Sequence, residues 1–253
     1  MSNQPIGTSV ISVQGFTKLY DRTLAVEDLT FRVAAGEVLG LVGPNGAGKT
    51  TTLRALAGIL RPTSGRVEIG GHDIAAAPVE AKQQLAFIPD EPHLFEYLTV
   101  TEHLEFIARM YQVADAPERV PQLLEELELG GKERSFPGEL SRGMRQKLAI
   151  ACGLLHDPRA LILDEPLTGL DPVGIRRMKQ TISRRAAAGA AVVLSSHLLH
   201  LVEEVCTRVL VLQHGRAVAV GTIAEIIADR PELAGKSLEE VFIQLVGAEP
   251  DHQ

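Results

Sequence analysis

The sequence lacks an apolar run long enough to cross a membrane. Its longest such run, from Ala186 to Leu194, is rich in alanine, contains Gly189 and follows two arginines. A membrane-spanning helix needs about 18 apolar residues. The opening segment MSNQPIGTSV has neither a basic leader nor an apolar signal core. The sequence therefore predicts a protein that does not span a bilayer and stays in the cytoplasm.

The sequence also has few cysteines and no excess of positive charge. The two cysteines, Cys152 and Cys206, fall in apolar patterns of helical spacing without any CxxC or metal-like spacing. We predict buried, reduced thiols and no disulfide. The formal net charge of −7 argues against a general binder of phosphate backbones, so nucleic acid is not an expected partner. With 253 residues and 45% hydrophobic content, the chain is long enough for one well-buried core.

Short apolar segments of two kinds predict an α/β core. Alternating segments bounded by turns predict antiparallel strands at residues 10–13, 29–33 and 67–69. Segments that are apolar on both faces predict a buried parallel sheet, with strands at residues 37–42, 160–163, 191–194 and 209–212. Helical periodicity follows the first three of these buried segments, as parallel strands require.

Residues 92–155 have a different pattern, with helical periodicity and no strands. Thr99 and Glu102 form a capping-box pattern ahead of the first helix. We expect an inserted helical lobe here. The tail predicts a short strand at residues 218–220 and two small helices, the second opened by a capping box from Ser237 to Glu240.

Residues 43–50, Gly-Pro-Asn-Gly-Ala-Gly-Lys-Thr, match the P-loop pattern in full, directly after a buried strand and before a helix. Glycines let backbone N–H groups converge on a β-phosphate, and the helix presents its positive end. Lys49 would reach the β- and γ-phosphates, and Thr50 would ligate Mg²⁺. The alternative is a glycine turn with an exposed lysine. Such a chance match would rarely have a buried strand before it and a helix after it. The predicted nucleotide-binding residues here are Gly43, Pro44, Asn45, Gly46, Ala47, Gly48, Lys49, Thr50 and Thr51.

The buried segment 160–163 ends in two adjacent carboxylates, Asp164 and Glu165. Asp164 is predicted to hold Mg²⁺ through water, and Glu165 to polarise the attacking water as general base. Acidic residues often close strands as solvated turns. The P-loop upstream favours the catalytic interpretation.

Leu140-Ser141-Arg142-Gly143-Met144 lies at the start of a predicted helix, with Ser141 as its natural N-cap. In its position ahead of Asp164, this segment resembles the signature motif of the ABC ATPase family, LSGGQ in its common form. The resemblance extends from about Val10 to the tail. It implies a P-loop NTPase (RecA-like) core sheet with an antiparallel β subdomain and an inserted α-helical signature subdomain. The implied division of the single domain 1–253 is a core at about 8–89 and 156–221, a helical subdomain at 90–155 and a tail at 222–253.

The resemblance also implies roles for single residues. Tyr20 resembles the aromatic residue that stacks on adenine, with Val26 beneath the base, although Tyr20 alone would suit a packing role. Asp171 lies in a segment similar to the D-loop. His197 resembles the switch histidine that contacts the γ-phosphate, so Glu165, His197 and Lys49 are the predicted catalytic residues.

Two departures from the family pattern affect the predicted site. Asp90, after Phe87-Ile88-Pro89, stands where the family usually has a glutamine. Its carboxylate can still contact Mg²⁺ or a water bound to it. The predicted metal residues are therefore Thr50, Asp90 and Asp164. Arg142 replaces the first glycine of the signature and Met144 its glutamine. Ser141 and Gly143 are kept, so Ser141, Arg142, Gly143 and Met144 are all predicted to contact nucleotide.

The resemblance implies an ATP-binding and ATP-hydrolysing subunit of an ABC transporter that uses ATP and Mg²⁺. Two such subunits, identical or paralogous, would pair head to tail and dock on a polytopic transmembrane permease at the inner face of the membrane. The lobe near residues 90–99 would pass motion to that permease. The tail at 237–245 is similar to that of ATPases serving ABC-2-type exporters, and this similarity favours export. The alternative is that the tail is a generic amphipathic helix without a bearing on the direction of transport.

Other classes fit less well. Chromosome-maintenance and DNA-repair ATPases carry long coiled coils between P-loop and signature, where this chain predicts only short helices. Translation-factor types usually carry two cassettes. A P-loop small-molecule kinase would have no reason to carry the signature, D-loop and His197 together. The cargo cannot be read, because substrate contacts lie in the membrane subunits.

Overall fold

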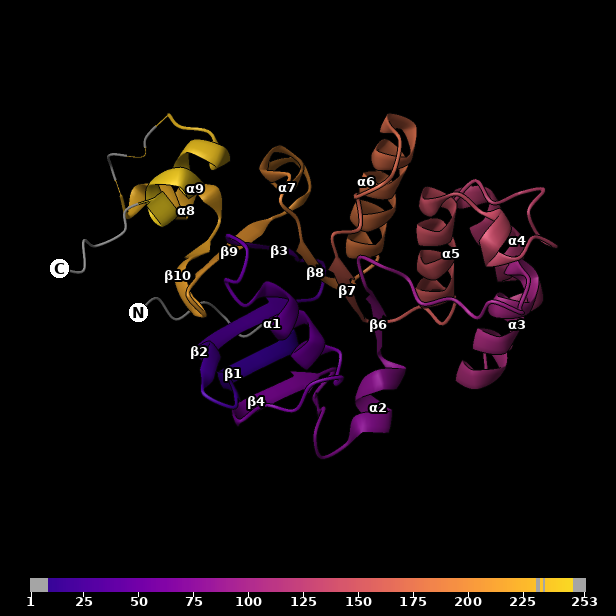
Figure 1. Ribbon diagram of the computed structural model, residues 1–253, viewed down its shortest axis with the longest axis horizontal. Coiled ribbons are helices and arrows are strands. Elements are labelled where there is room, and N and C mark those ends of the chain that lie inside the picture. The colour runs from indigo at the N-terminus through magenta and orange to yellow at the C-terminus, as the bar shows by residue number, and fades with distance from the viewer. Residues whose placement is uncertain (1–8, 231–232, 234, 248–253) are drawn as a thin grey trace.

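The computed structural model describes residues 9–230, 233 and 235–247. Figure 1 shows two sheets with one helix between them, further helices on the other face of the larger sheet and a helical lobe on one side. The expected start of the core at residue 8 and the end of the tail beyond residue 247 lie outside the described residues. Within those residues, no helix is both long and apolar enough to cross a membrane.

The central sheet has six strands in the order β10-β9-β3-β8-β7-β6. Five of them pair in parallel, and β10 runs antiparallel to β9. The predicted parallel sheet is thus confirmed. Its strands are β3 (Val38–Val42), β6 (Leu85–Ile88), β7 (Ala160–Asp164), β8 (Ala191–Ser195), β9 (Arg208–Gln213) and β10 (Arg216–Gly221).

Both faces of the inner strands β9, β3, β8 and β7 are buried, and the two faces belong to different hydrophobic clusters. In β7, Ala160 and Ile162 pack in the cluster that includes the antiparallel sheet, whereas Leu161 and Leu163 pack in the cluster that includes the lobe. Successive side chains of a strand point to opposite faces. Apolar residues are therefore needed at every position, which explains the continuous apolar segments of the sequence.

The smaller sheet is antiparallel, in the order β2-β1-β4-β5. Its strands are β1 (Ser9–Tyr20), β2 (Thr23–Ala34), β4 (Ser64–Ile69) and β5 (His72–Asp73). The three antiparallel strands predicted here are confirmed. The sheet shares one buried cluster with α1 (Lys49–Leu56), and α2 (Pro78–Gln83) leads from it to β6.

The lobe between β6 and β7 consists of α3 (Val100–Tyr111), α4 (Ala116–Glu126), η1 (Pro137–Glu139) and α5 (Arg142–Leu154). The predicted capping box is present, with Thr99 as the N-cap of α3 and Glu102 as its partner. Helix α5 packs closely on β6 at Gly153, where a side chain would not fit: a Cβ added there would lie 2.9 Å from Cδ1 of Ile88. The lobe is therefore anchored on the edge strand of the central sheet.

The remaining helices are α6 (Pro172–Ala187), α7 (Leu199–Val205), α8 (Ile223–Ala228) and α9 (Leu238–Gly247). The predicted tail helices are confirmed, including the capping box between Ser237 and Glu240. Nε2 of Gln213 donates to the carbonyl of Val246 at 3.0 Å, which ties α9 to the end of β9.

Both cysteines are partly buried free thiols, Cys152 within α5 and Cys206 just after α7. Burial raises the pKa of each thiol to about 12. Both side chains are therefore protonated at neutral pH.

Candidate active site

One pocket of about 420 Å³ collects most of the predicted site residues. It opens where β3, β6, β7 and β8 end, because the carboxyl ends of parallel strands lie at one edge of a sheet, where α/β proteins bind ligands. Of the predicted residues, the following line it: Asn45, Gly46, Ala47, Gly48, Lys49, Thr50, Thr51, Asp90, Asp164, Glu165 and His197.

The P-loop between β3 and α1 is shaped by close backbone contacts. Gly48 has φ +101, and a Cβ there would lie 2.7 Å from the carbonyl oxygen of Ala25. A Cβ on Gly43 would lie 2.4 Å from the carbonyl oxygen of Leu212. The turn after β9 supports the loop, since the amide of Gly215 donates to the carbonyl of Ala47 at 3.1 Å. Because α1 begins at Lys49, the unpaired amides of its first turn would face an anion bound in this loop.

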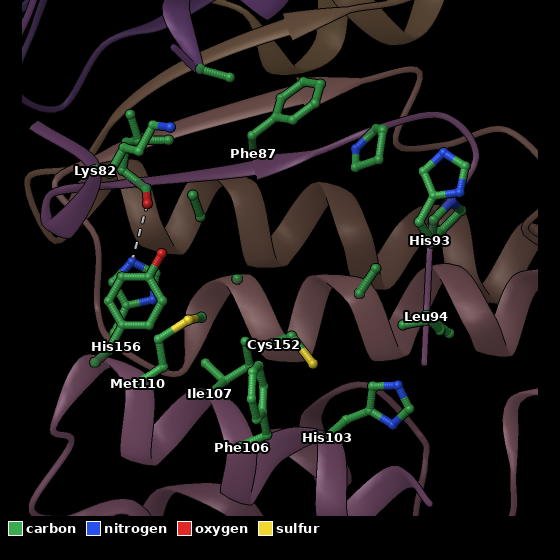
Figure 2. Close-up of a pocket in the computed structure, with 18 of the residues that line it drawn as sticks. Lys82, Phe87, His93, Leu94, His103, Phe106, Ile107, Met110, Cys152 and His156 are labelled. Carbon is green, nitrogen blue, oxygen red and sulfur yellow. Dashed lines mark hydrogen bonds between the residues drawn. The ribbon is translucent and has the colours of Figure 1, made fainter. Parts of the chain in front are cut away.

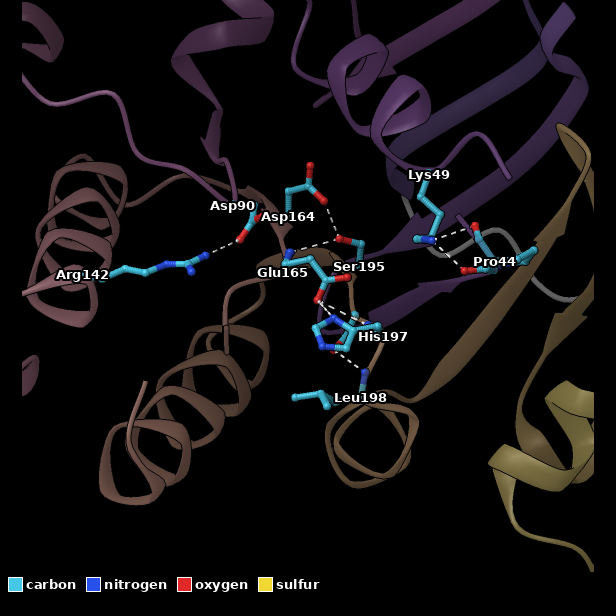
Figure 3. A network of polar contacts seen from close by, with 11 residues as sticks. Pro44, Lys49, Asp90, Arg142, Asp164, Glu165, Ser195, His197 and Leu198 are labelled. Carbon is cyan, nitrogen blue, oxygen red and sulfur yellow. Dashed lines mark hydrogen bonds and ion pairs between the residues drawn. The ribbon is translucent and has the colours of Figure 1, made fainter. Parts of the chain in front are cut away.

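Lys49 is held by the loop itself. Its ammonium donates to the carbonyl oxygens of Gly43 at 2.6 Å and Pro44 at 3.0 Å (Figure 3). Burial lowers the pKa of Lys49, while the nearby carboxylates of Glu165 and Asp164 act in the opposite direction. A phosphate in the pocket could replace the two carbonyls as the acceptor of this cation.

The two predicted carboxylates are joined by a residue that the sequence did not single out. Ser195 is fully buried, and its hydroxyl donates to Oδ1 of Asp164 at 2.6 Å and accepts from the amide of Glu165 at 3.0 Å. The only sequence signal is a polar residue closing an otherwise apolar strand. Asp164 thus keeps its Oδ2 for another partner.

Glu165 is fixed from both its backbone and its carboxylate. Its φ of +50 lies in the left-handed region, which costs a residue with a side chain about 1–3 kcal/mol. Its Oε2 lies 2.8 Å from Nδ1 of His197 and accepts from the amide of His197 at 3.3 Å. The two groups predicted to act on the water and the γ-phosphate are therefore in direct contact.

The donors in the pocket suit magnesium. Mg²⁺ prefers hard oxygen ligands and typically binds one or two carboxylates together with substrate phosphates. Thr50, Asp164 and Asp90 supply such oxygens. Among the described residues no group of three or more His, Cys, Asp or Glu could hold a metal unaided. The hydroxyl of Thr168, buried in the lining, has no hydrogen bond within the same ranges, which suits a bound water or phosphate.

Two residues predicted to contact the base lie outside the lining of this pocket. Tyr20 is exposed at the β1–β2 turn, where the ammonium of Lys18 lies 4.9 Å from its ring centroid. Val26 is fully buried and packs beneath Gly48. Val26 lies on the core face of β2 while its neighbour Ala25 lines the pocket, and a contact of Val26 with the base stays a prediction.

The signature residues begin α5 and do not line the pocket of their own subunit. The hydroxyl of Ser141 accepts from the amide of Met144 at 3.2 Å, as an N-cap should. Asp171 caps α6 in the same way by accepting from the amide of Gly174 at 2.7 Å. A contact between these residues and the nucleotide of a second subunit stays a prediction.

Comparison with known proteins identifies the family. Residues 26–168 match the family model described as ABC transporter. The ABC-type transporter ATP-binding protein EcsA of Bacillus subtilis is 33% identical over 97% of this chain and 100% of its own length. The daunorubicin/doxorubicin resistance ATP-binding protein DrrA of Streptomyces peucetius is 37% identical, over 89% of this chain and 68% of its own. Nod factor export ATP-binding protein I of Burkholderia pseudomallei is 38% identical, over 89% and 76%.

A solved structure, described as the ATP binding subunit of an ABC transporter, superimposes with a TM-score of 0.90 and 37% identity. The match covers 94% of this chain and 99% of the other. It confirms the predicted fold class. With its P-loop pocket and these relatives, the chain belongs to the ABC transporter family as an ATP-binding subunit.

Proposed function

We propose that the subunit hydrolyses ATP with Mg²⁺ and drives export through a separate membrane permease. The observation that carries the hydrolytic part is the meeting of Lys49, Asp164, Glu165 and His197 in one pocket. A cation, a metal-binding carboxylate, a base and a histidine are the groups that phosphoryl transfer to water requires.

Each residue has a distinct task in this proposal. Lys49 leaves its loop carbonyls to neutralise phosphate charge. Thr50, Asp164 and Asp90 would hold a magnesium ion, which would supply further charge stabilisation. Glu165 accepts the proton of the attacking water. His197 keeps the Glu165 carboxylate in place and faces the γ-phosphate.

The proposed active unit is a head-to-tail pair of subunits, identical or paralogous. Ser141 and Gly143 lie outside the pocket of their own chain, which supports a contact with nucleotide bound to another subunit. In related systems, charge stabilisation supplied across an interface accelerates phosphoryl transfer by on the order of 10³ to 10⁵. Hydrolysis should therefore depend on pairing.

Glu165→Gln tests the hydrolytic role, because it keeps the shape of the side chain and removes the base. ATP binding should persist while hydrolysis falls by roughly 10² to 10⁴. Binding is measured with a fluorescent ATP analogue and hydrolysis by phosphate release. Glu203→Gln, an exposed substitution on α7, is the matched control. Rapid hydrolysis by Glu165→Gln would show that another group activates the water.

A groove on the lobe supports the proposed permease contact. It has a volume of about 370 Å³ and lies between β6, the segment after it, α3 and α5 (Figure 2). Phe95 and Met110 line it and are 55% and 56% exposed, and Tyr97 nearby is 87% exposed. Exposed apolar groups of this kind mark interaction sites. We assign the groove to an apolar cytoplasmic segment of the permease, which would place the subunit at the inner face of the membrane.

Export is favoured because two relatives are named for Nod factor export and for daunorubicin/doxorubicin resistance. Co-purification from membranes with a co-expressed neighbouring permease tests both partner and surface. Met110→Asp should reduce recovery of the permease at least about tenfold, as loss of a well-buried interface anchor does. Val220→Asp, on β10 at the opposite edge of the sheet, should not. Equal recovery with both variants would contradict the assignment of the groove.

A further inference from the structure

Two of the three positions at which the sequence departs from common family motifs, Asp90 and Arg142, lie against each other. Nη2 of Arg142, the first residue of α5, lies 3.6 Å from Oδ1 of Asp90, which follows β6 (Figure 3). This distance fits an ion pair but exceeds that of a hydrogen bond. Oδ1 is itself buried and receives no hydrogen bond from any residue of the described ranges. The carboxylate therefore has capacity for a second partner.

The loop after β7 holds Arg142 in this position. A Cβ added to Gly169, at φ +77, would lie 3.2 Å from Cδ and Nε of Arg142, so the arginine stem lies directly on this glycine. A Cβ on Gly143 would lie 3.0 Å from the carbonyl oxygen of Gly169. The first turn of α5 and this loop are thus in tight contact, which directs the guanidinium towards Asp90.

Each charge is unfavourable where it stands unless the other is present. Arg142 places a cation at the positive end of α5, whose first turn carries no acidic residue. Asp90 adds a third carboxylate to a pocket that already contains Asp164 and Glu165. Pairing neutralises both charges.

We propose that Arg142 is a positioning residue that holds Asp90 in an ionic latch, and that magnesium-bound nucleotide competes with Arg142 for this carboxylate. The inference rests on the proposed function, which assigns Asp90 to the metal. In an empty pocket the latch is closed and ties α5 to the end of β6. In a loaded pocket Asp90 turns to the metal, and the guanidinium is released at the surface proposed to face the phosphates of a second subunit.

The competition predicts a coupled change in magnesium dependence. The two side chains are 56% and 45% exposed, and pairs of this kind are worth about two- to fivefold in an equilibrium. Arg142→Gln should therefore lower the Mg²⁺ concentration for half-maximal binding of mant-ATP by about two- to fivefold. The same substitution in an Asp90→Asn background should change nothing. All variants carry Glu165→Gln, so that binding is measured without turnover.

A nucleotide-free measurement tests the latch independently of the metal. Hydrogen exchange of amides in residues 89–94 and 142–145 should speed up in Arg142→Gln and in Asp90→Asn, and no further in the double variant. Arg142→Lys should restore part of the protection. Arg134→Gln and Glu91→Gln remove the same charges from exposed positions nearby and are the matched controls.

The latch is overturned if the two substitutions have additive effects on exchange. The competition is overturned if Arg142→Gln shifts the Mg²⁺ titration equally in both backgrounds, or if Asp90→Asn leaves that titration unchanged. Failure of the proposed magnesium site itself is distinguishable from failure of the latch. In that case the Glu165→Gln protein with Asp90 and Arg142 intact would bind mant-ATP without any dependence on Mg²⁺.

Discussion

Glu165 shows how much of the site depends on the surroundings of one residue. Its left-handed backbone would be unfavourable in isolation, yet its amide is bound by Ser195 and its carboxylate by His197. A strained residue persists only where neighbouring contacts determine its position. Ser195 also fixes Asp164, so one buried hydroxyl orients both the proposed base and the proposed metal ligand.

The raised pKa values of the two cysteines predict how fast their thiols react with an alkylating reagent at a given pH. With a pKa of about 12, roughly one thiol in ten thousand is ionised at pH 8, and the thiolate is the reactive form. Alkylation of native Cys152, isolated in a Cys206→Ala variant, should therefore be about a thousandfold slower than in the unfolded chain, where the pKa is near the ordinary 9.0. The rate is measured with iodoacetamide and mass spectrometry.

The alkylation rate should rise about tenfold per pH unit between pH 8 and 11. Fast labelling of the native protein at pH 8 would contradict the burial of this thiol. Because the folded pKa lies above the unfolded value, the neutral thiols support the fold fully below pH 9 and less as pH rises towards 12.

At the scale of elements, α5 is the helix that links the lobe to the pocket. It packs on β6 through Gly153, its first turn touches the loop at Gly169, and its N-cap is Ser141. Ser141 thus has one role that the structure shows, capping, and one that is proposed, contact with a phosphate in a second subunit. A substitution that keeps the first role and removes the second separates them.

Ser141→Asp makes this separation, because aspartate is as good an N-cap as serine and suits the positive end of a helix. The free energy of unfolding should change by less than about 0.5 kcal/mol. Hydrolysis should fall at least about tenfold, since a carboxylate would face the γ-phosphate of the partner. Denaturant unfolding and phosphate release are the two measurements.

Thr222→Ala is the control for capping, since Thr222 caps α8 far from the pocket. It should cost about 1 kcal/mol of stability without lowering hydrolysis by the folded protein. Full hydrolysis by Ser141→Asp would confine Ser141 to its structural role.

In the whole molecule, the start of α5 lies beside the P-loop pocket, but residues 141–144 do not line that pocket. The pocket is open to solvent at Thr50 and His197, which are both exposed, and α5 begins at Arg142, which pairs with Asp90 at the edge of this pocket. Ser141 does not line the pocket of its own chain, which favours the proposed contact with nucleotide bound to a second subunit. Two chains in head-to-tail arrangement can satisfy both pockets at once, and this symmetric pairing closes on itself.

The pairing predicts a nucleotide-dependent mass. Glu165→Gln binds ATP without consuming it, so with Mg-ATP its mass by light scattering should double, whereas with ADP it should stay that of one chain. Adding Ser141→Asp should prevent the doubling. A constant mass under all conditions, with ATP binding intact, would contradict pairing by the isolated subunit.

The amino-acid sequence alone predicted the features that depend on neighbours along the chain. The P-loop, the strand ending in Asp164 and Glu165, and the caps at Thr99 and Ser237 were all readable, because turn geometry, strand burial and helix capping are set within a few residues. The family resemblance placed the remaining segments in order. The limits of the helical subdomain and the tail, and the roles of single site residues, stay predictions.

Contacts between residues far apart in the chain are set by the folded structure. It joined Ser195 to Asp164 through the pairing of β7 with β8, and brought Arg142 to Asp90 through the packing of α5 on β6. It also turned Val26 to the core and left Ala25 at the pocket. Strand register and helix packing set these contacts, and a change of one residue in register would send each side chain to the opposite face.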